Sequence, residues 1–273
     1  MSVACRLVAV VAGVTVANAE REELSFHAGN ESRALILHIP PTCSAEGCPL
    51  VLVLHGSAED RAGLDDDALL WPALRFERNY DETYFSDHRE RHGYAQAYLA
   101  ARSSFGWYCW DNGWQNYSSC AGPADGNDNE YVKSAIELIR SRLNVIAVYL
   151  FGMSGGAKMA WKLACGGFPG PDVQLDGIAA VSGPISPGFQ RESPCTTPSI
   201  VAFHGALDHV TNVEYADDAE DWFVSTHGCQ EAASSVPHGG VQLNSYFEAG
   251  CQQSKLAYYR LAEGGHTVPG GPV

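Results

Sequence analysis

The chain has 273 residues, of which 45% are hydrophobic, and this is long enough for one large domain with a substantial core. Its formal net charge of −15 makes the surface repel nucleic acid and anionic membranes, so we expect neither as a partner. Internal repeats and low-complexity tracts are absent from the sequence. We therefore predict a single domain, and we expect it to act as a monomer.

The first nineteen residues have the pattern of a secretory signal peptide. Arg6 precedes an apolar run over 7–17, and the sequence ANA at 17–19 fits a small-residue cleavage site. A buried N-terminal strand is the alternative interpretation of this run. Removal of 1–19 leaves a secreted, extracellular domain over 20–273, with a charge of −16 because the leader carries one Arg and no acidic residue. No later apolar run approaches the length of a membrane span.

Cysteine usage also points to secretion. Removal of the leader with Cys5 leaves eight of the nine cysteines, an even count that fits an oxidising compartment. We expect no metal and no cofactor, because neither a zinc-type His/Cys spacing nor a Gly-rich phosphate loop occurs. Glycosylation sequons begin at Asn30 and Asn116. The sequence alone leaves the pairing open, although neighbours in chain order would close short loops: Cys43 with Cys48, Cys109 with Cys120, Cys165 with Cys195, and Cys229 with Cys251.

Apolar strands and amphipathic helices alternate along the chain. The run 49–56 is almost continuously apolar, as in a strand buried on both faces. This alternation predicts an α/β fold with a mostly parallel central sheet flanked by helices, in which functional sites gather at the carboxyl ends of the strands. The predicted elements are strands at 34–39, 49–56 and 94–100, a Trp-rich loop at 103–126, a helix at 128–143, a strand at 145–151, a helix at 156–165, strands at 176–183 and 199–205, and a last strand from 255 that runs into a glycine loop.

The segment GMSGG at 152–156 matches the pattern G-x-S-x-G between a buried strand and a helix. Such an elbow holds a serine outward at a sharp turn where flanking side chains would crowd, so glycine is needed beside Ser154. The following helix directs its amino end, with its partial positive charge, at the site. The pattern indicates Ser154 as a nucleophile, although Gly and Ser are also common in plain turns.

A serine hydroxyl needs a base, and the hydrolase arrangement places an acid and then a histidine after the serine along the chain. Asp208 follows the strand at 199–205 by a short turn, and His266 lies in the glycine loop after the last strand. We predict that His266 acts as base and then acid, while Asp208 holds the imidazole tautomer and stabilises its charged form. A turn-capping carboxylate and an exposed loop histidine are the structural alternatives.

Other acidic and histidine residues fit these roles less well, because they precede a strand, lie on a helix face or lie in a polar loop. His204 and His209 flank Asp208, and we expect them to be structural or to line the substrate pocket, with His204 as the substrate-binding candidate. The residues set aside are Asp172 and Asp176 before a strand, Asp217 and Asp218 on a helix face, and His227 and His238, which are expected to be exposed.

Acyl transfer also needs hydrogen-bond donors for the oxyanion. The strand at 49–56 ends in His55-Gly56-Ser57, where the backbone N–H of Ser57 can point inward. The backbone N–H of Gly155, the residue after Ser154, is the second predicted donor. A plain strand-ending turn is the alternative interpretation of His55-Gly56.

The loop at 105–120 carries Trp107, Trp110 and Trp114 among glycines and two cysteines. These side chains could form a rigid aromatic wall that binds a phenolic acyl group or a sugar ring. They could equally form a small core under a long loop. The sequence does not decide between the two interpretations.

With these motifs the chain resembles the secreted α/β-hydrolase esterases that include feruloyl esterases, acetylxylan esterases and extracellular polyhydroxybutyrate depolymerases. The resemblance runs from about residue 33 to the end and is carried by PLVLVLHG, GMSGGAKMAWKLAC, FHGALDHV, DWFVSTHGC and GGHTVPGG. It implies the disulfides Cys165–Cys195 and Cys229–Cys251.

Two positions depart from the relatives that the chain resembles. Val268 stands where many have Trp, and Gly155 stands where they often carry a larger polar residue. Both positions concern the lining of the pocket, so they bear on the substrate more than on hydrolysis.

The resemblance and the aromatic loop together predict a serine carboxylesterase that releases a hydroxycinnamate such as ferulate from plant-type or algal polysaccharide. Acetylxylan esterase and polyhydroxyalkanoate depolymerase are the enzymatic alternatives. Depolymerases commonly add a polymer-binding module, for which the seven residues after His266 leave no room. A carbohydrate-binding module on a hydrolase scaffold that lost its chemistry is the alternative from another class, and the joint presence of Ser154, Asp208 and His266 argues against it.

Overall fold

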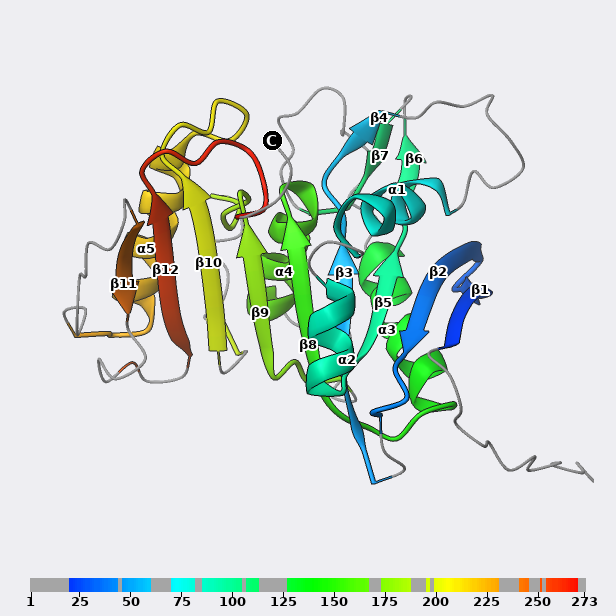
Figure 1. Ribbon diagram of the computed structural model, residues 1–273. Helices are drawn as coiled ribbons and strands as arrows, with labels where there is room; N and C mark the ends of the chain where they lie inside the picture. Colours follow the sequence, from blue (N-terminus) through cyan, green and yellow to red (C-terminus); the bar gives the residue numbers. More distant parts are fainter. Residues whose placement is uncertain are drawn as a thin grey trace, which may run out of the picture.

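Nine strands form one mixed sheet in the computed structural model of the chain (Figure 1). The structure describes residues 20–43, 46–59, 70–81, 85–104, 107–112, 127–166, 173–187, 195–196, 199–230, 241–245, 251 and 254–269. The strand order across the sheet is β1-β2-β5-β3-β8-β9-β10-β12-β11. The strands are β1 (Glu20–Ala28), β2 (Glu31–Ile39), β3 (Cys48–Leu54), β5 (Ala95–Leu99), β8 (Val145–Met153), β9 (Gly177–Val181), β10 (Ser199–Gly205), β11 (Val241–Ser245) and β12 (Lys255–Leu261).

The six strands from β5 to β12 in this order are parallel, and the strands at the two ends of the sheet pair antiparallel. The carboxyl ends of all six parallel strands therefore meet at one edge, the upper edge in Figure 1. A small antiparallel sheet stands above this edge, in the order β4 (Ala58–Glu59), β7 (Trp107–Cys109) and β6 (Arg102–Ser104).

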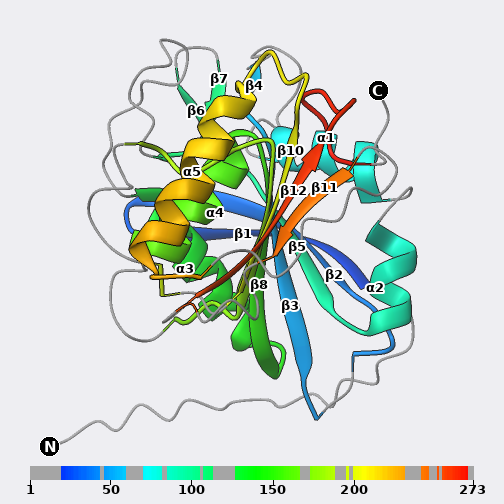
Figure 2. The same ribbon diagram turned by 90° about the vertical axis from the view of Figure 1, so that its left-hand side faces the viewer.

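Helices cover both faces of the central sheet (Figure 2). On one face lie α3 (Asn127–Arg140), α4 (Gly155–Gly166) and α5 (Val213–Thr226), and on the other lie α1 (Trp71–Tyr80) and α2 (Ser86–His92). Side chains alternate along β3, so that Leu52 and Leu54 pack in the larger core toward α3 and α4 while Val53 packs in the core beside α1. Both faces of the middle strands are thus buried, as their continuous apolar sequences predict.

The predicted α/β-hydrolase class with a mostly parallel sheet is confirmed, and β10 has the predicted bounds. The first strand, the helices α1 and α2, the small sheet and β11 were not predicted. Strand β1 alternates exposed and partly buried residues at the sheet edge, and α2 has the sequence SDHRERH with Arg89 as its buried residue. The short alternation of Leu24, Phe26 and Ala28 in β1 was not recognised as a strand, and α2 contains no apolar residue.

Three disulfides of the predicted pairing are present: Cys43–Cys48, Cys165–Cys195 and Cys229–Cys251. Cys109 is also disulfide-bonded, while its predicted partner Cys120 lies outside the described residues, as do the leader and Asn116. Asn30 is exposed in the turn between β1 and β2. None of the helices within the described ranges is long and apolar enough to cross a membrane.

The disulfide between Cys165 and Cys195 ties the end of α4 to the segment that enters β10, across 30 residues of sequence. Replacing both cysteines by Ala is expected to lower the free energy of unfolding by about 3 kcal/mol, because the cross-link restricts the unfolded chain. Urea unfolding followed by circular dichroism measures the change. The matched variant without Cys43 and Cys48, which are 5 residues apart, should lose less, and an equal or larger loss there would contradict the loop-length argument.

Candidate active site

Ser154 lies at the turn between β8 and α4, at the carboxyl edge of the sheet. Its φ of 52° is in the left-handed region, which is uncommon for a residue with a side chain. The backbone N–H of Ser154 donates to the carbonyl of Val181 at 2.8 Å, so β9 holds the turn from the side. The strained position persists because the surrounding backbone fixes it.

Glycines allow the close backbone contacts behind this turn. A Cβ on Gly152 would lie 2.4 Å from the carbonyl oxygen of Gly156, and a Cβ on Gly156 would lie 2.1 Å from that of Leu54. Both oxygens belong to backbone and cannot move aside. Glycine at these two positions therefore lets α4 begin directly against the strand ends, which is the physical content of the G-x-S-x-G pattern.

The structure brings Ser154, His266 and Asp208 together from the ends of β8, β12 and β10. His266 Nε2 is 2.9 Å from Ser154 Oγ, and His266 Nδ1 is 2.8 Å from Asp208 Oδ2. Because an ionised carboxylate only accepts hydrogen bonds, Nδ1 carries the proton and Nε2 is left to accept from the serine hydroxyl. The three predicted residues thus have the geometry of a proton relay, although they are separated by up to 112 positions in the sequence.

Asp208 is a buried residue in the loop after β10, although its neighbours Leu207 and Val210 are exposed. Its side chain is fully buried, and Oδ1 accepts the backbone N–H groups of Val210 at 2.9 Å and Thr211 at 2.8 Å. These bonds leave Oδ2 directed at His266. The Asp208 carboxylate therefore caps the turn and also binds the imidazole of His266. The two roles considered for Asp208 are compatible.

His204 has the surroundings of a structural residue, one of the two roles that we expected for it, and it also lines a pocket with Phe203 and Ala216. It is buried, and its Nε2 donates to the carbonyl of Thr211 at 2.8 Å, with Asp208 Oδ2 at 3.4 Å. Burial lowers the pKa of His204, which keeps the ring neutral. We therefore assign it to the support of the Asp208 loop. His227 is likewise buried rather than exposed, and its Nε2 accepts from the backbone N–H of Cys195 at 3.2 Å.

The two predicted oxyanion donors adjoin each other beside Ser154. Gly155 is the first residue of α4, and a Cβ on it would lie 3.3 Å from the backbone nitrogen of Ser57. A Cβ on Gly56 would lie 3.2 Å from the Cβ of Ser154, so the turn after β3 directly adjoins Ser154. This placement suits a shared oxyanion site at the helix N-terminus.

His55 fixes the shape of this turn from inside the protein. Its Nε2 accepts the backbone N–H of Ala101 at 3.0 Å, so the proton is on Nδ1, which donates to the carbonyl of Gly56 at 2.5 Å. Burial lowers the pKa of His55 to about 4, so the ring stays neutral at physiological pH. The side chain of His55 thereby orients the peptide group that leads into Ser57.

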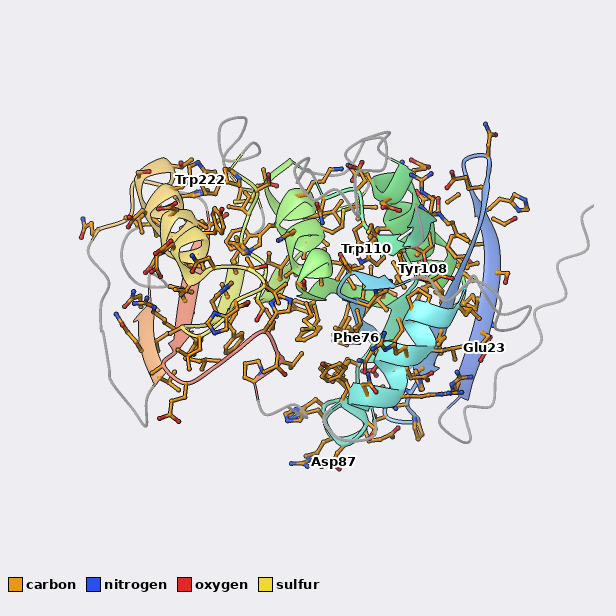
Figure 3. The ribbon with its side chains drawn as sticks, turned by 90° about the horizontal axis from the view of Figure 1, so that it is seen from above. Glu23, Phe76, Asp87, Tyr108, Trp110 and Trp222 are labelled. Atoms are coloured by element: carbon orange, nitrogen blue, oxygen red, sulfur yellow. A yellow bond between two sulfur atoms is a disulfide. The ribbon has the colours of Figure 1, made fainter. Side chains whose placement is uncertain are left out.

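Trp110 belongs to the core rather than to an aromatic wall at the substrate. It is 2% exposed, and its Nε1 donates to the carbonyl of His55 at 2.8 Å. Figure 3 shows it inside the fold, near α3 and α4. Of the other two predicted wall residues, Trp107 lies in β7 with its side chain undescribed, and Trp114 lies outside the described residues. The structure therefore removes Trp110 from the substrate-binding set.

A chain of buried charges anchors the segment that carries Trp110. Lys162 Nζ donates to Asp111 Oδ2 at 2.9 Å, and the backbone N–H of Asp111 donates to Asp128 Oδ2 at 2.6 Å. Asp128 in turn accepts from Arg33 at 2.5 Å. The next residue, Asn112, is buried and its Nδ2 donates to the carbonyl of Gly155 at 3.4 Å. Sequence analysis missed Asn112, because an Asn in a loop carries no signal of its tertiary contact.

Lys158 is a second residue near the site that sequence analysis missed. It lies one helical turn after Ser154, to whose carbonyl its backbone N–H donates at 3.1 Å, and it is buried. Burial lowers the pKa of its ammonium group to about 8, while the negative charge of Asp208 acts in the opposite direction. The available signal was a lysine within the otherwise apolar start of a helix. Within the described ranges, no group of three or more His, Cys, Asp or Glu residues is placed to hold a metal ion.

Comparison with known proteins places this geometry in a structural class. No protein-family model and no curated protein matches the sequence. Among solved structures, the acetyl xylan esterase from Aspergillus awamori superposes with a TM-score of 0.62 at 13% identity, covering 92% of this chain and 95% of that one. A thermostable esterase superposes with a TM-score of 0.50 at 14% identity, covering 88% of this chain and 54% of that one. The chain therefore has the α/β-hydrolase fold, which is also the fold of these esterases.

The buried ammonium of Lys158 predicts an unusual pH dependence of stability. Because its pKa in the folded protein is about 8 and the ordinary value is 10.5, folding costs free energy below pH 8, and this cost disappears as the pH rises to 10.5. Lys158→Met is therefore expected to raise the free energy of unfolding by about 3 kcal/mol at pH 7, and this gain should vanish near pH 11. Urea unfolding at both pH values tests this, with Lys133→Met on α3 as the control. A difference between wild type and Lys158→Met that does not vary with pH would contradict the assignment.

Proposed function

We propose that this protein is a serine carboxylesterase in which Ser154, His266 and Asp208 are the catalytic triad. The observation that carries the proposal is the continuous hydrogen-bond path from Ser154 Oγ through both nitrogens of His266 to the buried carboxylate of Asp208. A relay of hydroxyl, imidazole and carboxylate is the arrangement that activates a serine for acyl transfer. Its position at the carboxyl edge of an α/β-hydrolase sheet supports the same assignment.

In the first half of the reaction Ser154 Oγ attacks the carbonyl carbon of the ester, and its proton passes to His266 Nε2. Asp208 stabilises the imidazolium through the Nδ1–H bond. The carbonyl oxygen becomes an oxyanion, which the N–H groups of Ser57 and Gly155 stabilise. The tetrahedral intermediate then expels the alcohol oxygen, which takes the proton from His266 and leaves the acyl group on Ser154.

The second half regenerates the enzyme with water. Water gives a proton to His266 Nε2 while its oxygen attacks the acyl carbon, and the same donors hold the new oxyanion. Collapse of this intermediate breaks the bond to Ser154 Oγ, which recovers its proton from His266. One acid and one alcohol are released for each water consumed, and no cofactor takes part in these steps.

The proposed substrate is an ester on a plant-type or algal polysaccharide, hydrolysed outside the cell. The disulfides fit an oxidising compartment, and a protein of the same fold is named as an acetyl xylan esterase. The aromatic loop suggested a hydroxycinnamoyl group, but Trp110 lies in the core and no longer supports it. Acetyl esters and feruloyl esters are therefore both candidate substrates to be assayed, together with short-chain polyhydroxyalkanoate.

The triad assignment predicts a large effect of Ser154→Ala. Removal of the nucleophile should lower kcat on the order of a million-fold, as loss of a triad nucleophile does in serine hydrolases. Purified protein is assayed on acetylated xylan, methyl ferulate and polyhydroxybutyrate, with wild type and variant side by side. Release of acetate or ferulate by the wild type alone is the expected result.

The matched control for this experiment is Ser141→Ala, which removes an exposed hydroxyl at the end of α3, far from the site. Its activity should equal that of the wild type. Undiminished hydrolysis by Ser154→Ala would show that the activity lies elsewhere. Hydrolysis of the polyester without release of either acid would overturn the polysaccharide substrate and leave the mechanism intact.

A further inference from the structure

The start of α4 has a feature that the relay of Ser154, His266 and Asp208 does not use. The position that a Cβ on Gly155 would occupy lies 2.7 Å from Ser57 Oγ and 3.8 Å from Asn112 Nδ2. A hydroxyl and a carboxamide from two segments far apart in sequence thus converge on the residue directly after the nucleophile. The space that a side chain at position 155 would occupy is therefore filled by the polar groups of Ser57 and Asn112.

Ser57 lies on the open side of this contact. It is exposed, whereas Gly155 and Asn112 are buried. A Cβ on the preceding Gly56 would lie 3.2 Å from the Cβ of Ser154, so the residue before Ser57 adjoins the nucleophile. A hydroxyl rotates about its C–O bond and can donate a hydrogen bond to a newly formed charge without movement of the backbone.

Asn112 is the buried residue that contacts Gly155. Its Nδ2 donates to the carbonyl of Gly155, and its backbone N–H donates to the carbonyl of Trp110 at 2.9 Å. The neighbouring Asp111 is fixed by the ammonium of Lys162. Of the two polar residues that adjoin Gly155, Ser57 is thus the exposed one and Asn112 the buried one.

We propose that the hydroxyl of Ser57 is a third oxyanion donor, beside the backbone N–H groups of Ser57 and Gly155. Glycine is required at 155 because a Cβ there would displace this hydroxyl. The inference rests on the proposed function, since an oxyanion forms only if the protein transfers acyl groups. Ser57 acts by hydrogen bonding alone. The proton of the Ser57 hydroxyl stays on Oγ while negative charge develops on the carbonyl oxygen of the substrate. No proton is transferred to or from Ser57.

Loss of the hydroxyl should therefore affect the transition state and not the substrate complex. Ser57→Ala is expected to lower kcat roughly 100-fold with little change in KM, the cost of removing one oxyanion donor. It should also weaken the binding of a boronic acid that forms a tetrahedral adduct with Ser154, while the thermal unfolding midpoint stays unchanged. Ser57→Thr keeps the hydroxyl and should keep most of the activity. Ser225→Ala, which removes an exposed hydroxyl on α5, is the control.

A double-variant cycle tests the role of Gly155. The methyl group of Gly155→Ala would lie 2.7 Å from Ser57 Oγ, which is the terminal atom of a side chain and can move by rotation about the Cα–Cβ bond. The variant should fold and lose at least as much kcat as Ser57→Ala. The double variant should fall no further than Gly155→Ala, because the same hydroxyl is lost only once. Losses that multiply would overturn the displacement argument.

The outcomes separate this inference from the proposed function. If the wild type hydrolyses esters, Ser154→Ala is inactive and Ser57→Ala has the kcat of the wild type, Ser57 is not an oxyanion donor and the esterase proposal stands. If Ser57→Ala and Ser57→Thr lose the same activity, a packing role explains Ser57 and the inference fails. If the wild type hydrolyses none of the esters, both proposals fail.

Discussion

The position of Ser154 depends on how closely the first turn of α4 packs against the strand ends. Three backbone contacts, at Gly152, Gly156 and Gly183, leave no room for a side chain, and the last of these lies against the carbonyl of Ser154 itself. Backbone cannot rotate out of the way as a side chain can. These contacts therefore hold Ser154 in its left-handed conformation, and the hydrogen bonds to His266 depend on that placement.

A second set of interactions fixes the turn at His55, against which Gly156 packs. The segment around Trp110 is fixed by buried charges that satisfy one another, from Arg33 through Asp128 and Asp111 to Lys162. Such a network adds little net stability, since desolvation offsets much of the attraction, but an incomplete one is costly. Its effect is to select one arrangement of this segment. The turn of His55, to which Trp110 donates, is thereby held in one conformation as well.

The three residues of the candidate site that were predicted from the sequence have one property in common. Ser154, Asp208 and His266 each follow a recognisable strand, and parallel strands end at a common edge, so local patterns predict a distant meeting. The burial of Trp110 and of His227 could not be predicted in this way. Whether an aromatic ring or an imidazole faces solvent or core depends on which partner covers it, and that partner comes from elsewhere in the chain. The polar helix α2 and the edge strand β1 were missed because their burial alternates weakly or rests on a buried arginine.

The histidine of the relay follows β12, which is the last strand but one and is flanked outside by the five-residue β11. Short strands at the border of a sheet are the first to separate in the thermal fluctuations of a native protein. His266 therefore lies next to the border of the sheet, while Ser154 follows β8 in its middle. For the proposed esterase, warming should therefore reduce ester hydrolysis reversibly at temperatures below the midpoint of global unfolding.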